Sequence, residues 1–227
     1  MIRAITFDCY GTLVDWETGI RTFITPILKK SRGTHYEGRP HIAPDDWIRE
    51  WEARQFALLQ PYRPYREILM QSFGDTMRHF LLESFADDGP AFVRSLAAWP
   101  LFDDVRPNLK RLARRHRLGI ISNIDDDLLA ESVGQIAAPF SVLVTAEQVG
   151  EYKPALAPFT HAAERLGLAP ESILHVAFGE KYDLAAARRA GFRTAWLRRH
   201  EAAPPTVETD FRCDSLPALC DWLDGAG

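Results

Sequence analysis

The chain has 227 residues, of which 46% are hydrophobic, and its formal net charge is -4. This length and composition exclude a disordered or fibrous protein and allow one large domain, or one domain that carries a smaller insertion. The weak negative charge gives no general attraction to nucleic acid or to anionic membranes, so we expect a small-molecule partner.

The cysteines and the hydropathy pattern indicate a cellular compartment. Cys9, Cys213 and Cys220 are scattered and lack the spacing of metal ligands, which is typical of reduced thiols in a cytosolic protein. Met1 leads directly into a strand-like run, so no signal peptide is expected, and no apolar run reaches the ~20 residues that cross a bilayer. We therefore predict a cytoplasmic protein without a membrane partner.

The first predicted strand covers residues 2–8, and the pattern changes soon after it. Residues 16–98 contain no convincing buried strand and instead show helical periodicity, so we predict a helical cap domain inserted directly after the first strand. The expected cap helices cover 19–31, 44–60, 63–86 and 89–98, with a polar loop at 31–41 between the first two.

The rest of the chain alternates short apolar runs with amphipathic segments. The runs are rich in β-branched residues, which favours strands covered on both faces of a parallel sheet. This order predicts a doubly wound α/β core domain, formed by 1–15 and 99–227, that binds its ligand at the carboxyl ends of the strands. The expected strands are 118–123, 141–146, 173–178 and 193–198, and the expected helices are 106–116, 125–137, 155–167 and 183–190.

Polar residues lie where the predicted strands end. Asp8 follows the first strand, Ser122 and Asn123 end the second, and Lys153 precedes a helix. A carboxylate held at a strand end, near the backbone N–H groups of a glycine-containing loop, can act as a nucleophile. Taken separately, Asp8 is also explained by a turn, Lys153 by a solvated surface position, and Asp183 by helix capping.

Four motifs taken together resemble the haloacid dehalogenase superfamily over essentially the whole core. The motifs are Asp8 to Leu13 in DCYGTL, IISN with Ser122 or Asn123, EYKP with Lys153, and HVAFGEKYDLAAARRAG with Asp183. Phosphatases of this superfamily typically carry a second aspartate two residues after the nucleophile, as general acid and base. The L-2-haloacid dehalogenases carry tyrosine there, as this chain does at Tyr10, and their helical cap also follows the first motif.

The resemblance implies a reaction and a set of roles. Asp8 would attack the carbon that bears the halogen and form an ester that water then hydrolyses. Lys153 would keep Asp8 ionised, and Asp183 would orient Lys153 or the water. Because halide leaves as a stable anion, no acid is needed at Tyr10, which becomes a wall and an anchor.

The resemblance also implies substrate contacts. Thr12, Ser122 and backbone amides would hold the oxygens of Asp8 or of the substrate carboxylate, and a cap arginine would meet the substrate or the halide. The predicted catalytic residues are Asp8, Thr12, Lys153 and Asp183, and the predicted substrate-binding residues are Cys9, Tyr10, Ser122, Asn123, Arg49, Arg54, Arg63 and Arg66.

The fourth motif departs from both groups. Ala177 and Phe178 replace residues that include a magnesium ligand of the phosphatases, so no metal and no cofactor are predicted. The serine and asparagine of the L-2 dehalogenases are also missing, and the polar groups at hand are His175, Glu180 and Lys181.

We therefore predict a cofactor-independent hydrolase that acts on a small 2-haloacid such as a haloacetate, with homodimer formation as a family-level expectation. Two alternatives stay open. One is a magnesium-dependent phosphatase that uses Asp8 as its nucleophile. The other is a non-catalytic carboxylate binder on a degenerate fold of the same superfamily.

Overall fold

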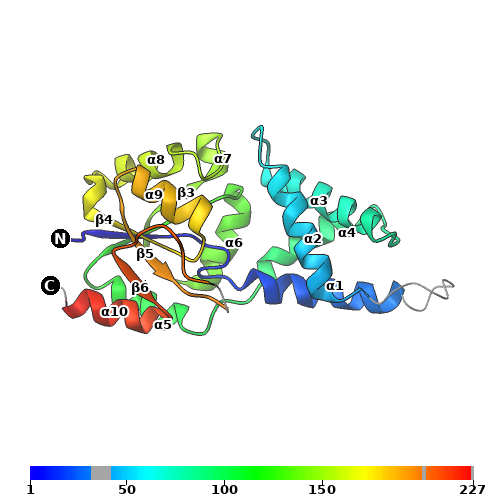
Figure 1. The fold of residues 1–227 in the computed structure, drawn as a ribbon, viewed down its shortest axis with the longest axis horizontal. Helices are drawn as coiled ribbons and strands as arrows, with labels where there is room; N and C mark the ends of the chain where they lie inside the picture. Colours follow the sequence, from blue (N-terminus) through cyan, green and yellow to red (C-terminus); the bar gives the residue numbers. More distant parts are fainter. Residues whose placement is uncertain (32–41, 201–202, 226–227) are drawn as a thin grey trace. The chain divides into compact units, whose positions relative to one another are not determined.

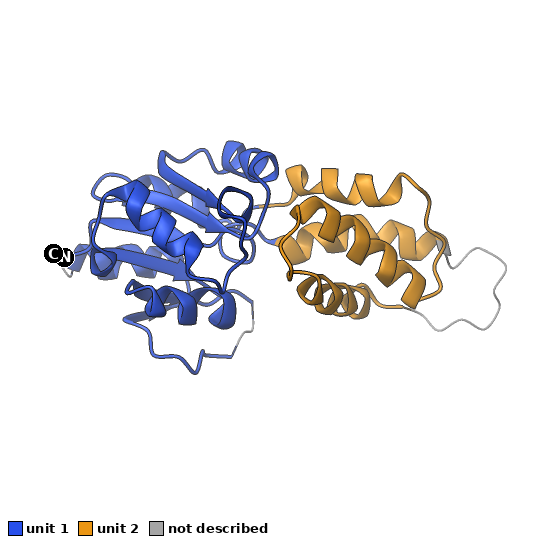
Figure 2. Ribbon diagram, turned by 90° about the horizontal axis from the view of Figure 1, so that it is seen from above, with its two compact units in different colours: residues 1–15, 101–227 blue, residues 16–100 orange. Residues whose placement is uncertain are grey.

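The computed structural model describes residues 1–31, 42–200 and 203–225, which form two compact units (Figure 2). Unit 1 consists of Met1–Asp15 and Leu101–Gly227, and unit 2 consists of Trp16–Pro100. The insertion predicted at 16–98 ends two residues before the end of unit 2 and begins at the same residue. The polar loop predicted at 31–41 falls almost wholly outside the described residues.

Unit 1 is built on a parallel sheet with the strand order β3-β2-β1-β4-β5-β6 (Figure 1). Each pairing between neighbouring strands is parallel, as predicted for a doubly wound fold. The predicted strands are confirmed to within two residues at each end, and β6 is an addition that the sequence did not predict. The strands are β1 (Ala4–Phe7), β2 (Arg117–Ser122), β3 (Phe140–Thr145), β4 (Ile173–Ala177), β5 (Arg193–Leu197) and β6 (Phe211–Cys213).

Helices cover both sides of this sheet. Figure 1 shows α8 and α9 on one side and α5 and α10 on the other, which confirms the doubly wound architecture. The helices of unit 1 are α5 (Val105–Leu112), α6 (Asp126–Ile136), α7 (Ala146–Val149), α8 (Ala157–Leu166), α9 (Ala185–Arg189) and α10 (Leu216–Gly225), with short turns η2 (Pro170–Ser172) and η3 (Glu180–Leu184). Of these, η3 is a π-helix.

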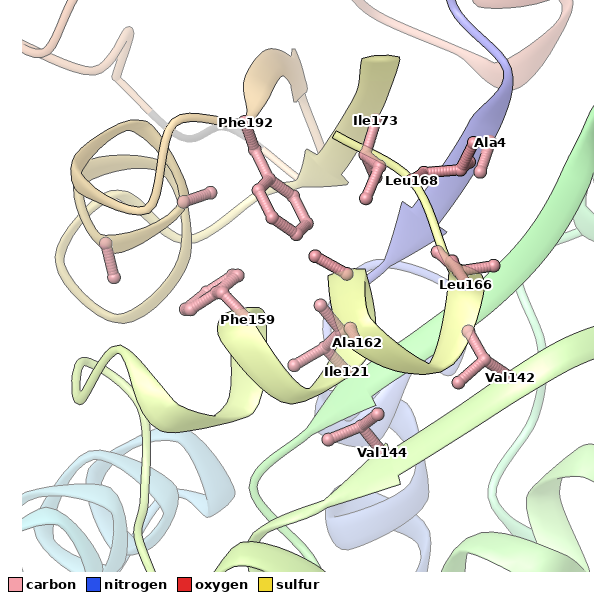
Figure 3. Close-up of a cluster of buried hydrophobic side chains, with 13 residues drawn as sticks. Ala4, Ile121, Val142, Val144, Phe159, Ala162, Leu166, Leu168, Ile173 and Phe192 are labelled. Atoms are coloured by element: carbon pink, nitrogen blue, oxygen red, sulfur yellow. The ribbon is translucent and has the colours of Figure 1, made fainter. Parts of the chain in front are cut away.

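Buried apolar side chains join α8 to the sheet (Figure 3). Phe159 and Leu166 of α8 pack in one cluster with Val142 and Val144 of β3 and with Ile121 of β2. Each such side chain contributes about 1.5–3 kcal/mol when it is fully buried. The cluster therefore makes the sheet a firm support for the loops that follow its strands.

Unit 2 is helical, and aromatic rings fill its interior. Phe73 and Phe92 stack with their ring centroids 5.2 Å apart, and the ring of Trp47 packs against both. No helix in the described part of the chain is long and apolar enough to cross a membrane. The elements of unit 2 are α1 (Trp16–Ser31), α2 (Pro44–Ala57), α3 (Tyr65–His79), α4 (Asp88–Ser95) and the 3-10 turn η1 (Leu96–Ala98).

One expected helix of this unit is much shorter than predicted. The periodicity predicted a helix over 63–86, but α3 ends at His79. Leu81 has a φ of 53°, a left-handed backbone conformation that is incompatible with a continuing right-handed helix. The apolar residues after His79 extended the helical pattern beyond the point where the backbone turns.

Candidate active site

The candidate site lies where the strand order reverses. From β1, the strands β2 and β3 follow one another toward one edge of the sheet, and β4, β5 and β6 follow one another toward the opposite edge. Doubly wound sheets bind ligands in the crevice at the carboxyl ends of the strands beside such a switch point. Asp8 follows β1 at this point, and its backbone N–H donates to the carbonyl of Val176 in β4 at 3.1 Å.

The loop after Asp8 closes on itself. Gly11 has a φ of 92°, which favours glycine, and its N–H donates to the carbonyl of Val14 at 2.8 Å. The N–H of Thr12 donates to the carbonyl of Cys9 at 3.3 Å. The expectation that the backbone amides of this loop point at the site is therefore wrong for Gly11 and Thr12, because the turn itself uses them.

Thr12 acts instead through its side chain. Its hydroxyl donates to Oδ2 of Asp8 at 3.0 Å and accepts from the backbone N–H of Phe178 at 3.2 Å. Both Thr12 and Asp8 are buried. Thr12 therefore links the loop after β1 to the loop after β4 and fixes one oxygen of the Asp8 carboxylate.

Lys153 lies at the centre of the site and is 2% exposed. Its ammonium group donates to Oδ1 of Asp8 at 2.9 Å, to the carbonyl of Ile121 at 3.0 Å, and to Oδ1 of Asp183. An ammonium group has three N–H donors, so this set of acceptors satisfies it completely. The predicted grouping of Asp8, Thr12, Lys153 and Asp183 is thus present as one hydrogen-bonded cluster.

Burial and charge act differently on the two carboxyl groups. Burial raises the pKa of Asp8, the charge of Asp183 adds to this, and Lys153 only partly offsets it. Burial also acts to raise the pKa of Asp183, but the attraction of Lys153 and the hydrogen bond from His175 outweigh it, so that pKa is lowered. Asp8 is therefore the more basic of the two carboxylates, as suits a nucleophile.

The same two carboxylates keep Lys153 charged. Burial acts to lower the pKa of Lys153, but the negative charges of Asp183 and Asp8 outweigh it and raise the pKa above its ordinary value. The ammonium form therefore persists throughout the range in which proteins are stable, and the site always contains one buried positive charge between two carboxylates.

Tyr10 points its hydroxyl at a helix of unit 1. The hydroxyl lies 2.9 Å from Oγ of Ser132 in α6, and Ser132 is fully buried. The neighbouring Cys9 is also buried, and burial, followed by the charge of Asp8, raises the pKa of its thiol well above the ordinary value. Tyr10 is thus anchored as expected, and Cys9 is a neutral thiol. The substrate-binding roles predicted for both residues stay predictions.

A Tyr10→Phe variant distinguishes an anchor from an acid. Loss of the hydrogen bond to Ser132 should cost about 0.5–1.5 kcal/mol of unfolding free energy, while turnover of a true substrate changes less than about threefold. A general acid at this position would instead lose about 10²–10⁴-fold in rate. Steady-state kinetics and urea unfolding of the variant measure both quantities, and Ser132→Ala provides the control for the lost hydrogen bond.

Asn123 binds the backbone of Lys153 with both ends of its amide. Its Oδ1 accepts from the backbone N–H of Lys153 at 2.7 Å, and its Nδ2 donates to the Lys153 carbonyl at 3.1 Å. Asn123 therefore holds the loop that carries the lysine. Ser122, also at the end of β2, is 3% exposed. The substrate-binding roles predicted for both side chains stay predictions.

The arginines predicted to meet the substrate lie in unit 2. Arg49 pairs with Asp46 at 3.1 Å, and Arg54 pairs with Glu50 at 2.6 Å. Further candidates are Arg63, which donates to Gln71 at 2.7 Å, and Arg66, which lies half-buried on α3. Their predicted role stays a prediction.

The sequence did not single out Arg199, which supports the loop after β1. It is 6% exposed, donates to the carbonyl of Thr12 at 3.0 Å, and binds both carboxylate oxygens of Asp104, at 2.8 and 3.0 Å. Its guanidinium also lies 4.1 Å from the ring centroid of Phe102. The only sequence signal was an arginine pair directly after a buried strand.

Magnesium, which the phosphatases of the superfamily use, does not fit the residues of this site. The ammonium group of Lys153 already bridges the carboxylates of Asp8 and Asp183. Within the described ranges, no group of three or more His, Cys, Asp or Glu residues could hold a metal ion. The absence of a cofactor nevertheless stays a prediction.

The family model of the haloacid dehalogenase-like hydrolases matches residues 2–191. The chain belongs to that family. This hydrolase is 25% identical over 204 residues to haloacetate dehalogenase H-2 of Moraxella sp. (strain B), covering 88% of this chain and 87% of the relative. It is 29% identical over 158 residues to the phosphoserine phosphatase of Thermus thermophilus, covering 68% of this chain and 61% of that relative.

The fold of this hydrolase is similar to that of a defluorinating L-2-haloacid dehalogenase, with a TM-score of 0.83 at 22% identity, covering 98% of this chain and 95% of the other. The predicted superfamily, the α/β fold and the classification as a hydrolase are thereby confirmed. At this level of identity the structural likeness shows the fold, and the substrate has to be argued from the site.

Proposed function

We propose that this protein is a hydrolytic dehalogenase that displaces halide from a small 2-haloacid through an ester on Asp8. The observation that carries the proposal is the contact of Tyr10 with Ser132, because it leaves the position of the phosphatase acid without an acid directed at the reaction. The similarity to haloacetate dehalogenase H-2 supports the class of substrate. Cleavage of a carbon–halogen bond needs no proton on the leaving group, unlike cleavage of a phosphate ester.

The first step is attack by Asp8. One oxygen of its carboxylate forms a bond to the carbon that bears the halogen, the carbon–halogen bond breaks, and halide leaves with the bonding electrons. Lys153 and Thr12 hold the carboxylate in one orientation for this attack. The raised pKa of Asp8 makes its carboxylate a better nucleophile than that of Asp183.

The second step hydrolyses the ester. Water attacks the carbonyl carbon of Asp8 while Asp183 accepts a proton, and Lys153 stabilises the negative charge that develops on the Asp8 oxygen. The bond from that carbon to the substrate oxygen then breaks, and the leaving alkoxide takes the proton back. The sum is one 2-hydroxy acid, one halide ion and one proton, with an oxygen of water left in Asp8.

Ser122 gives the site a further polar contact. Ser122 lies at the carboxyl end of β2 and is 3% exposed. A buried hydroxyl at this edge suits a substrate carboxylate, whose oxygens accept hydrogen bonds. Ser122→Ala should therefore raise KM for haloacids more than it lowers kcat.

Halide release from a panel of haloacids, measured with and without chelator, tests the proposal. We expect release from chloroacetate or 2-chloropropionate that a chelator leaves unchanged, and negligible release of phosphate from p-nitrophenyl phosphate even with added magnesium. Magnesium-dependent release of phosphate at an ordinary enzymatic rate, without halide release from any haloacid, would establish the phosphatase instead. Haloacid binding without turnover would establish the carboxylate binder.

A further inference from the structure

A row of polar side chains crosses the sheet beneath the site. Thr6 of β1 is the register partner of His175 in β4, and His175 is the register partner of Thr194 in β5. All three residues are fully buried. The interior strands of parallel sheets are usually apolar on both faces, and a buried polar group costs free energy unless it is hydrogen-bonded. The row therefore calls for an explanation beyond packing.

His175 is hydrogen-bonded at both ring nitrogens. Its Nδ1 lies 3.0 Å from the hydroxyl of Thr6, and its Nε2 lies 3.3 Å from Oδ1 of Asp183. The ring of Phe159 packs edge-on against the imidazole, with the centroids 5.2 Å apart. A carboxylate can only accept, so Nε2 carries the hydrogen, and in the neutral ring Nδ1 then accepts from the Thr6 hydroxyl.

These contacts give the two oxygens of Asp183 different roles. Oδ1 accepts from both Lys153 and His175, while Oδ2 accepts no hydrogen bond within the described residues. A Cβ built on Gly179 would lie 2.9 Å from Oδ2, closer than real contacts allow, so glycine leaves the space in which this oxygen lies. His175 and Lys153 thus fix one oxygen of the carboxylate, and no described residue hydrogen-bonds to the other.

We propose that His175 is a positioning residue for ester hydrolysis, which it serves by holding the Asp183 carboxylate so that Oδ2 meets the attacking water. This inference rests on the proposed function. His175 is fully buried and does not touch the reacting atoms itself. The hydrogen bond from His175 also helps to lower the pKa of Asp183. Attack by Asp8 on the substrate does not depend on Asp183 Oδ2, so the two steps of the reaction should respond differently to loss of the imidazole.

Three variants test this role. His175→Phe removes both hydrogen bonds of the imidazole, and Thr6→Val removes only the one at Nδ1. Thr194→Val is the matched control, because it makes the same change in the same buried row, where the Thr194 hydroxyl has no partner among the described residues. Thr6→Val keeps the shape of the side chain, so it stays informative if His175→Phe unfolds.

Rapid-mixing kinetics and intact-protein mass spectrometry separate the two steps. In His175→Phe we expect the first turnover of halide release to stay within about threefold of wild type, while kcat falls about 10- to 100-fold, the range seen when the outer hydrogen-bond partner of a metal ligand is removed. The ester on Asp8 should then accumulate as a mass adduct. Thr6→Val should show a smaller effect of the same kind, and Thr194→Val should match wild type.

The outcomes against the proposal are distinct from failure of the proposed function. The positioning role would be overturned by an unchanged kcat in His175→Phe and Thr6→Val. It would also be overturned if the rates of both steps fell equally and no adduct formed. In either case, halide release by wild type would still support the dehalogenase. No halide release by wild type from any haloacid would overturn both.

Nitrogen NMR of ¹⁵N-histidine-labelled protein adds a measurement that needs no turnover. We expect His175 to carry its hydrogen on Nε2, with an Nδ1 signal that shifts in Thr6→Val and stays in place in Thr194→Val. A hydrogen on Nδ1 in place of Nε2 would contradict the proposed geometry directly, whatever the substrate.

Discussion

An Asp8→Asn variant should lose halide release by about 10⁶-fold, the scale of loss when the nucleophile of a hydrolase is removed. The folded state should be kept, because the amide can still accept the hydrogen bond that Lys153 donates to Oδ1. Burial raises the pKa of Asp8, so its charge costs free energy in the folded protein, and the neutral amide removes this cost. The remaining charges, on Lys153 and Asp183, balance each other.

A single turnover in heavy-oxygen water identifies the nucleophile directly. We expect the label first in the Asp8 side chain, found by mass spectrometry of the peptide that contains it, because the product takes its new oxygen from Asp8. Asp15→Asn is the control, as it neutralises a nearby carboxylate that lies outside the cluster around Lys153. Label in the product alone during the first turnover would mean that water attacks the substrate directly.

Much of the fold follows from local patterns in the sequence. Short β-branched runs predicted β1 to β5, because strands buried on both faces are usually apolar along most of their length. The sequence did not reveal β6, since Phe211–Cys213 is short and flanked by polar residues. The π-helix at Glu180–Leu184 has no local signal in the sequence either.

The candidate site was predictable where it depends on the ends of strands. Asp8, Lys153 and Asp183 meet because parallel strands place their carboxyl ends at one edge. The direction of each hydrogen bond was not predictable. Tyr10 reaches Ser132, 122 residues further on, and the amide of Asn123 binds the backbone of Lys153, because tertiary packing fixes these side chains.

A Lys153→Met variant should lose both turnover and stability. Methionine fills the space of the lysine stem but leaves the carboxylates of Asp8 and Asp183 buried without a cation, and removal of one partner from a buried ion pair costs about 3–5 kcal/mol. The three hydrogen bonds of the ammonium group disappear at the same time. Loss of the charge that holds Asp8 and stabilises the ester intermediate should abolish halide release.

The loss of unfolding free energy in Lys153→Met should depend on pH, and the charges of Asp8 and Asp183 determine the direction of this dependence. In wild type the pKa of Asp183 is lowered, so its stabilising contribution is present at neutral pH and is lost as the pH falls through that pKa. Without Lys153, burial and mutual repulsion raise the pKa of both carboxyl groups, and protonation of either one stabilises the fold. Urea unfolding should therefore show a smaller loss of unfolding free energy in Lys153→Met at pH 5 than at pH 7. The control Lys110→Met, on the exposed side of α5, should show no loss at either pH. A deficit that grows as the pH falls would contradict the assignment of Lys153 as the cation shared by Asp8 and Asp183.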